Sequence, residues 1–492
     1  MTESITDNSQ QDFQDLKKKS LQGMSALFVR QVLVKVIFFA GNIILARQLA
    51  PEIFGIYAIV QFVVQFFSTF GDVGIGAALI QKKAELSQEE LSTTFWLQQM
   101  LVWLVVGVVI LIAPLALKVY PTLPPVGVWL IRAMAVSFLF SSLKTIPAIL
   151  MERDIDFKRI AWVDITENLA FQGVAITCAY QGYGAWSFVA AAITRAFLGA
   201  VLIYTISSWR PSLHYRFESV KGLVRFGLPY QGNQILSFVK DAVTPLFVGA
   251  FAGVAAVGYL NFARNFAFAP LIISETFGRV AFPAFSKIQD DKVLLARTVE
   301  RSIRMMTLVM FPVMGAMVAL GPELIQVFFT NKWMPGLNSF YCFCMSPIAI
   351  GISMPLYSAI LSLGRSGVLL AMTGSLIIFE WSLGVVFVVL WGFTGAALTQ
   401  LVIVPLFTYV YKVVLSKNGI HINITKNIVS QFLLSLLTVA AIIYLKGFFV
   451  VNLVTVSLFL VISLILSAGL FWLFDRSTFL ELIDYFMKAI KK

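Results

Sequence analysis

Apolar stretches of about 20 residues recur along the whole chain and are separated by short polar segments. A stretch of this length can cross the ~30 Å hydrocarbon core of a bilayer as a helix. Backbone groups in lipid must be hydrogen-bonded within their own segment, which favours helices. The pattern therefore predicts an all-α polytopic membrane protein with about fourteen spans, at residues 21–46, 53–80, 91–117, 126–149, 159–181, 184–207, 222–249, 255–284, 303–321, 337–362, 367–390, 393–415, 426–446 and 452–474.

Within four of these spans, polar residues recur every three or four positions, so each helix is expected to have one polar side. A charge at bilayer depth costs at least ~2.5–3.5 kcal/mol and needs a watery space or a partner. We therefore predict a net cationic cavity between the two halves. Its predicted lining residues are Arg30 and Lys35 of the first span, Gln61, Gln65 and Asp72 of the second, Gln234, Lys240 and Asp241 of the seventh, and Asn261, Arg264, Glu275 and Arg279 of the eighth.

The remaining intramembrane cations have simpler interpretations. Arg132 and Lys144 lie near predicted span ends, where long side chains reach the headgroups. Arg195 is expected to form a structural pair with Asp164 or Glu167. Structural ion pairs also remain an alternative within the predicted cavity, as Asp72–Arg279 or Glu275–Arg264.

Composition supports the membrane assignment, since 59% of the residues are hydrophobic, 13% are charged and the mean hydropathy is +0.86. A soluble domain has about 45–50% apolar and about 25% charged residues. With the N-terminus in the cytosol, 25 of the 37 Lys and Arg residues fall in cytosolic segments. Only Arg47, Lys118, Lys332 and Lys446 fall on the other side. This asymmetry predicts that both termini face the cytosol. The net charge of +12 is then expected to meet anionic lipid headgroups, and no nucleic acid is expected as a partner.

Each half of the chain holds six predicted spans, which indicates parallel repeats. An offset of 203 residues places Gly55 on Gly258, Ala78 on Ala281 and Asp72 on Glu275. The predicted organisation is a cytosolic tail (1–20), an N-lobe (21–208), a cytosolic linker (209–221), a C-lobe (222–416), two further spans (417–474) and a cytosolic amphipathic tail (475–492).

Motifs for catalysis or cofactor binding are not found in the sequence. The three cysteines lie in apolar runs, and His214 and His421 lie in polar loops, so neither a disulfide framework nor a metal site is expected. Predicted external loops are short and nearly free of acidic residues, which argues against an enzyme acting on polyprenyl-linked glycans. The cationic balance of the four lining helices argues against a multidrug/cation antiporter, whose substrates are cations.

Several segments resemble the Wzx-like polysaccharide flippases of the multidrug/oligosaccharidyl-lipid/polysaccharide (MOP) superfamily, of the colanic acid and teichuronic acid exporter type. In the first half they are residues 45–57 (LARQLAPEIFGIY), 70–82 (FGDVGIGAALIQK) and 91–96 (LSTTFW). In the second half they are residues 280–291 (VAFPAFSKIQDD) and 331–333 (NKW).

The resemblance implies an inner-membrane flippase for undecaprenyl-pyrophosphate-linked oligosaccharide repeat units, acting by alternating access in polysaccharide biosynthesis. It also implies cavity cations on spans 1, 2, 7 and 8, although span 2 has no Lys or Arg before Lys82. No cofactor is expected, and H⁺ or Na⁺ antiport follows as a hypothesis. Polysaccharide polymerase or export machinery are further expected partners. A peptidoglycan-precursor flippase remains an alternative that cavity charge does not separate.

Overall fold

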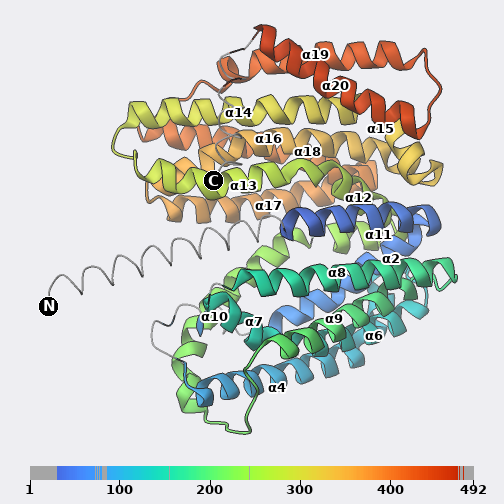
Figure 1. Ribbon diagram of the computed structural model, residues 1–492, viewed down its shortest axis with the longest axis vertical. Coiled ribbons are helices and arrows are strands. Elements are labelled where there is room, and N and C mark those ends of the chain that lie inside the picture. The colour runs from blue at the N-terminus through green and yellow to red at the C-terminus, as the bar shows by residue number, and fades with distance from the viewer. Residues whose placement is uncertain are drawn as a thin grey trace. The chain divides into compact units, whose positions relative to one another are not determined.

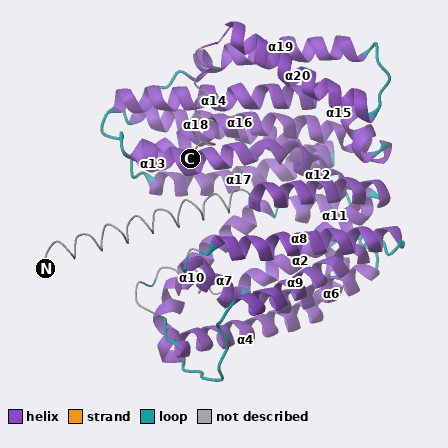
Figure 2. Cartoon of the chain, in the orientation of Figure 1, coloured by secondary structure: helices purple, strands orange, loops and turns teal. Residues whose placement is uncertain are grey.

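A computed structural model describes residues 30–480, apart from residues 72, 73, 75, 77, 80, 81, 83–85, 155, 243, 475 and 477–479. The side chains of residues 226, 228–230, 233, 237, 240, 241, 272, 273, 275, 276, 279 and 280 are also outside the description. The described residues form helices joined by short turns and contain no strand, as Figure 2 shows. The prediction of an all-α fold is therefore confirmed. Both predicted terminal tails fall almost entirely outside the described residues.

Contacts divide the chain into two compact units, Met1–Ala255 and Ala256–Lys492. Unit 1 begins with a described helix over Arg30–Gln48. Its other helices, all but α5 labelled in Figure 1, are α2 (Pro51–Ser68), α4 (Gln88–Ile112), α5 (Ala116–Val119), α6 (Val126–Leu143), α7 (Thr145–Arg153), α8 (Phe157–Tyr180), α9 (Trp186–Ile206), α10 (Phe217–Asp241) and α11 (Gly249–Phe251). A 3₁₀ turn, η1 (Thr69–Gly71), follows α2, and a π-helical turn, η3 (Thr244–Val248), precedes α11.

Unit 2 starts within α12 (Val254–Phe268). Its other helices are α13 (Ile272–Ser286), α14 (Lys292–Ala319), α15 (Gly321–Leu324), α16 (Leu337–Ser362), α17 (Ser366–Trp391), α18 (Phe393–Lys417), α19 (Ile424–Lys446) and α20 (Leu453–Phe474). A 3₁₀ turn, η4 (Ala269–Leu271), joins α12 to α13, while η5 (Ile325–Phe329) and η6 (Asn331–Gly336) precede α16. The sequence predicts a linker between the two repeats at residues 209–221. The compact units divide later, after Ala255, so the linker remains a prediction.

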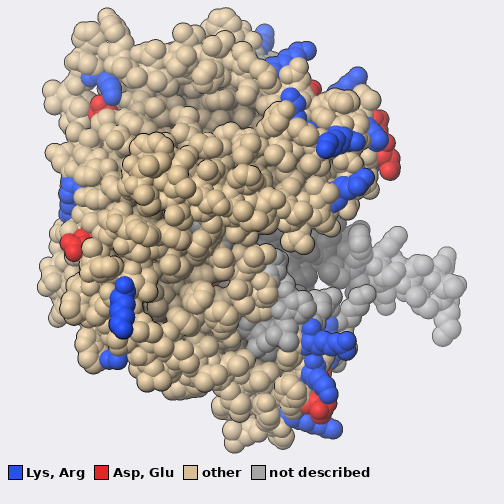
Figure 3. Space-filling model, turned by 180° about the vertical axis from the view of Figure 1, so that it is seen from behind, with Lys and Arg blue, Asp and Glu red and all other residues tan. Residues whose placement is uncertain are grey.

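Eleven of the described helices are long and apolar enough to cross a membrane. Three further spans are predicted where α8, α10 and α12–α13 lie; α8 and α10 carry more charged side chains, and α12 and α13 are only 15 residues long each. The number of fourteen spans therefore remains a prediction. On the face shown in Figure 3, charged side chains are few and uncharged side chains cover most of the surface.

Local sequence explains where several helices begin. Pro51 occupies the first turn of α2, where its missing N–H costs nothing. At the start of α4, the Ser87 hydroxyl accepts from the Glu90 amide, and the Glu90 carboxylate accepts from the Ser87 amide. This reciprocal capping box satisfies two backbone donors that the helix itself leaves unpaired. Asp291 caps α14 in a similar way by accepting from two amides of its first turn.

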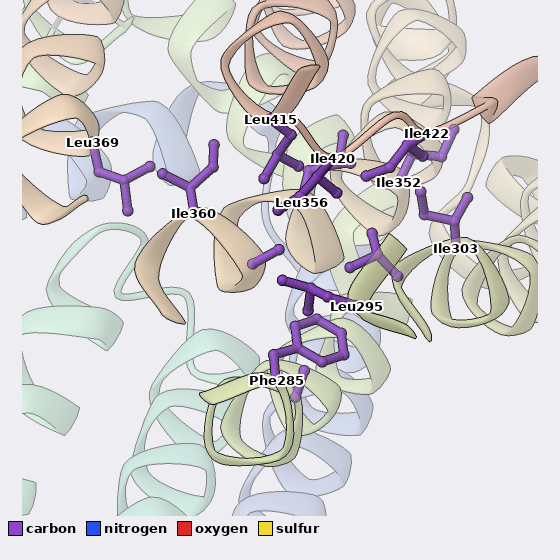
Figure 4. Close-up of a cluster of buried hydrophobic side chains, with 13 residues drawn as sticks. Phe285, Leu295, Ile303, Ile352, Leu356, Ile360, Leu369, Leu415, Ile420 and Ile422 are labelled. Carbon is purple, nitrogen blue, oxygen red and sulfur yellow. The ribbon is translucent and has the colours of Figure 1, made fainter. Parts of the chain in front are cut away.

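Each unit contains a cluster of buried apolar side chains, and two positions of one cluster correspond to two positions of the other. In unit 1 the cluster includes Ala78 and Ile149. In unit 2 it includes Ala281 and Ile352, and Figure 4 shows Ile352 among the apolar side chains of this cluster. Both pairs are separated by 203 residues, which is the offset that aligned the two halves of the sequence. The internal repeat itself stays a prediction.

Candidate functional site

Arg30, at the start of the first described helix, forms an ion pair with Asp164 of α8. Arg30 Nε lies 3.1 Å from Asp164 Oδ2, and the two side chains are 33% and 30% exposed. Farther along the same two helices, a Cβ at Gly41 would overlap the side chain of Gln172. Both contacts advance in the same direction, so the two helices run parallel, as two odd-numbered predicted spans should. Arg30 is thus partly neutralised by its own unit.

A second charged group lies one turn farther along α8. Glu167 is buried, with 1% of its side chain exposed, and its two carboxylate oxygens lie 2.6 and 2.8 Å from Lys144 Nζ. Arg195 Nε of α9 lies 3.6 Å from Glu167 Oε2, while 46% of the Arg195 side chain remains exposed. Gly199 permits this arrangement, because a methyl group there would overlap the Glu167 carboxylate. The predicted Arg195–Glu167 pair is confirmed.

The interpretation of Lys144 as a residue that reaches the headgroups is wrong. Helix α6 ends at Leu143 and α7 begins at Thr145, so Lys144 lies at a break between two helices. From that break its ammonium group reaches the buried Glu167 carboxylate instead of the membrane surface. The ion pair removes the need for a headgroup partner. A carboxylate inside the bundle thus neutralises Lys144, and solvation at the membrane surface is not needed.

Lys35 lies five residues after Arg30 and is half-buried. At about 100° per residue, it projects roughly 140° away from the side of the helix that carries Arg30 and meets α8. The two cations predicted for the first span therefore occupy different sides of their helix. The two observed contacts with α8, Arg30–Asp164 and Gly41–Gln172, both lie on the Arg30 side of the helix.

The polar stripe of α2 lies away from the core of unit 1. Gln61 and Gln65 are exposed, whereas Gly55, Ile59 and Val64 are buried. The predicted separation of a polar and an apolar side is confirmed for this helix. Asp72, the last predicted member of the stripe, lies outside the described residues.

Helix α10 lies against α4 and η1 within unit 1, and one of its rings reaches α2. The ring of Phe238 stacks on Phe62 with centroids 5.3 Å apart. The buried side chain of Gln231 donates to the carbonyl oxygen of Thr69. Gln234 is exposed, so this predicted residue remains accessible. The predicted side chains Lys240 and Asp241 lie outside the description. Helix α10 thus contacts α2 through aromatic rings and contacts η1 through one amide.

In α12, Asn261 and Arg264 are half-buried and share a side with the exposed Asn265. The Arg264 guanidinium lies 5.5 Å from the centroid of the Phe268 ring. Among the described residues, no carboxylate pairs with Arg264. Its Cα is about 15 Å along the helix from Val254, within the span predicted at residues 255–284. The side chains of Glu275 and Arg279 are not described, so their predicted pairings remain predictions.

Sequence reasoning missed a buried carboxyl group in unit 2. Glu380 of α17 is buried, and one of its oxygens accepts a 2.6 Å hydrogen bond from Gln400 Nε2 of α18. Glu380 is the one acidic residue of an otherwise apolar helix. That isolation was a usable signal, since an acid within a span needs a partner or a function.

A polar seam between α14 and α19 was also missed. Arg304 Nη2 donates to Asn427 Oδ1 at 2.9 Å, and Ser435 Oγ donates to the Phe311 carbonyl oxygen at 2.9 Å. Gln431 lies fully buried between these two levels. Side-chain hydrogen bonds of this kind hold helices together in membranes. The i, i+4, i+8 spacing of Asn427, Gln431 and Ser435 was the available signal.

The eleven described helices that are long and apolar enough to cross a membrane indicate a multi-pass membrane protein. The chain belongs to the polysaccharide biosynthesis protein family, whose model matches residues 44–337. This confirms the resemblance to MOP-superfamily polysaccharide flippases noted from the sequence motifs. The expectation of a transporter that is not an enzyme agrees with the family and its relatives.

Two relatives carry names that describe their roles. The lipopolysaccharide biosynthesis protein WzxC of Escherichia coli K12 is 24% identical over 359 residues, covering 71% of each chain. The succinoglycan biosynthesis transport protein ExoT of Rhizobium meliloti 1021 is 26% identical over 294 residues, covering 59% of this chain and 58% of ExoT. Among solved structures, the lipid II flippase MurJ in an inward closed conformation has a TM-score of 0.71 at 14% identity, covering 96% of this chain and 100% of MurJ. This last likeness shows a shared fold.

Proposed function

We propose that the protein moves polyprenyl-pyrophosphate-linked oligosaccharide units from the cytosolic to the outer leaflet of a bacterial inner membrane for polysaccharide biosynthesis. Family membership supports the substrate class. The observation that carries the proposal is Arg264, a cation inside a span with no described carboxylate partner and with Asn261 beside it.

The chemistry of such a substrate fits this arrangement. A pyrophosphate and its sugars cannot enter hydrocarbon without replacements for their water. Arginine supplies charge and paired N–H donors for phosphate oxygens, and an amide such as Asn261 can replace water around sugar hydroxyls. The polyprenyl chain needs no such replacement and can remain in lipid.

The orientation we propose follows the distribution of basic residues. With 25 basic residues in cytosolic segments and four on the other side, both termini face the cytosol. The inside-negative potential then favours outward movement of an anion by about 2.3 kcal/mol per charge per 100 mV. H⁺ or Na⁺ coupling remains part of the proposal as a means of resetting the empty cationic carrier. Polymerase or export machinery would receive the product on the outer side.

The charges in the two units favour this function over drug export. The ion pairs on α8 join three cations to two carboxylates, and Arg264 adds a further cation in unit 2. A carrier of cationic drugs would require the opposite excess. A lipid II flippase would bind the same pyrophosphate head group, and the MurJ-like fold alone supports that alternative.

Reconstitution tests the proposal. Purified protein in proteoliposomes should move a fluorescent polyprenyl-pyrophosphate-linked N-acetylhexosamine between leaflets, measured as a change in the fraction that dithionite quenches. Vesicles without protein give the background rate. A wild-type rate equal to that background would refute the proposed function for this class of substrate.

A further inference from the structure

The segment between α9 and α10 joins the two predicted repeats, and it lies fixed along the first turns of α4. We call residues 207–216 the strap. Gln88 Nε2 donates to the carbonyl oxygen of Arg210 at 2.7 Å. The hydroxyls of Ser92 and Ser212 lie 2.8 Å apart, and the Ser212 amide donates to Ser92 Oγ at 3.0 Å. The strap is therefore held on α4 at two successive turns.

Two more hydrogen bonds extend this attachment. Trp96 Nε1 donates to the Ser212 carbonyl oxygen at 2.8 Å, and the Arg216 amide donates to Thr93 Oγ1 at 3.0 Å. The side chains of Ser92 and Thr93 are fully buried under the strap. Three of the four attached side chains of α4 belong to the LSTTFW segment, residues 91–96, which no part of the transport chemistry explains. We call Gln88, Ser92, Thr93 and Trp96 the clamp residues.

Apolar packing reinforces the clamp on both sides. Trp209 of the strap meets the Phe95 ring edge-on, with centroids 5.8 Å apart. Val220 and Leu223, in the first two turns of α10, are buried in the same apolar cluster as Leu91 and Phe95. Opening this region would expose that apolar surface to water and break the hydrogen bonds of the clamp residues. A flexible tether would show neither feature.

We propose that the clamp residues hold the strap, and with it the cytosolic end of α10, on unit 1 throughout the transport cycle. The linker between repeats is then a fixed connection, and relative movement of the two halves does not pivot there. This inference rests on the proposed function only in assuming that such a movement occurs. It assigns the LSTTFW segment a positioning role for the helix that carries Gln234.

A reversible cross-link tests the clamp. The Ser92 and Ser212 hydroxyls are close enough for a disulfide after Ser92→Cys and Ser212→Cys, in a background with Cys178→Ala, Cys342→Ala and Cys344→Ala. Oxidation should join the two positions, with the flip rate of the fluorescent pyrophosphate-linked probe staying within about twofold of the reduced sample. Each single-cysteine variant controls for the oxidant. A tenfold or larger loss on oxidation that reductant reverses would overturn the proposal.

Hydrogen exchange tests the clamp without requiring transport. The Ser212 and Arg216 amides should remain protected in proteoliposomes carrying the probe, with and without an inside-negative potential. Ser92→Ala and Thr93→Val should speed exchange in the strap, whereas Thr166→Val on α8 should leave the strap unchanged. Loss of strap protection in wild type on adding the probe would show that the clamp opens. If wild-type protein does not move the probe, the proposed function fails while this exchange result still decides on the clamp.

Discussion

Lys144 Nζ lies within 2.8 Å of both carboxylate oxygens of Glu167, and this contact joins the break between α6 and α7 to the middle of α8. The same carboxylate is approached by Arg195 of α9. One buried acid thus neutralises cations from two other segments of unit 1. A third cation, Arg30, is held by Asp164 one turn away. The charges of α8 therefore hold the first helix, the α6–α7 break and α9 in place.

Removing the charge of Glu167 should destabilise unit 1. In Glu167→Gln, Lys144 would be left as a partly buried ion without its counter-charge, and such a loss costs about 3–5 kcal/mol. We expect a lower unfolding temperature in detergent, followed by tryptophan fluorescence. Glu52→Gln, at an exposed position of α2, is the matched control. Equal unfolding temperatures for both variants would mean that the ion pair contributes nothing.

A double substitution separates the cost of a broken pair from the value of the pair. Lys144→Met combined with Glu167→Met removes both ions and leaves Arg195 partly hydrated. Apolar replacement of a whole buried pair is often close to neutral. The double variant should therefore unfold at a higher temperature than Glu167→Gln. The reverse order would contradict the view that the stranded Lys144 charge causes the loss.

Gly199 offers a test in which no charge is changed. A methyl group there would overlap the Glu167 carboxylate, so Gly199→Ala should push that group off Lys144 and destabilise the protein by about 1–3 kcal/mol. At Gly173 of α8 an added methyl meets open space, and Gly173→Ala should be neutral or stabilising. Thermal unfolding of the two variants side by side gives the comparison. Similar behaviour of both would place the Glu167 carboxylate elsewhere.

Arg264 should contribute to transport more than to folding. Loss of a charge-assisted hydrogen bond to phosphate costs about 1.5–3 kcal/mol, so Arg264→Ala should lower the flip rate about tenfold or more. Arg264→Lys keeps the charge and should retain part of the rate. Arg365→Ala removes an exposed cation between α16 and α17 and should leave the rate unchanged. Wild-type rates in Arg264→Ala would remove this residue from the proposed binding site.

Local periodicity explains which parts of the site were predictable. The exposure of Gln61 and Gln65 follows from helical spacing alone, because positions three or four apart share a side. The pairing of Lys144 with Glu167 depends on how three helices pack, and these residues are 23 positions apart in the sequence. Pro147, four residues after Leu143, cannot donate to the Leu143 carbonyl oxygen and is a local signal for the break, but nothing local indicated that Lys144 would point inward.

The strap was likewise predictable in its local features and unpredictable in its tertiary contacts. Its length and its position between two spans were visible in the sequence, which predicted a cytosolic linker. Its attachment to α4 joins residues about 120 positions apart, as between Ser92 and Ser212. Hydrogen bonds over such separations depend on tertiary packing, which hydropathy does not describe. The resemblance of residues 91–96 to a known family marked the segment without giving its structural reason.

Membrane potential should drive transport in the proposed direction. In proteoliposomes with the cytosolic side made negative by a potassium gradient and valinomycin, outward flipping of the pyrophosphate-linked probe should accelerate, since about 2.3 kcal/mol acts on each charge per 100 mV. Reversing the gradient should slow it. An ionophore control with equal potassium on both sides sets the baseline. Acceleration by the opposite potential would contradict anion movement outward.

The central claim is that cations within the spans recognise the phosphate head of the substrate. The most direct measurement compares two fluorescent probes with the same polyprenyl chain and the same sugar, one linked by pyrophosphate and one by a neutral ether. Wild-type protein in proteoliposomes should flip the pyrophosphate probe about tenfold faster or more, as expected for a charge-assisted contact. Equal rates for the two probes would contradict the account.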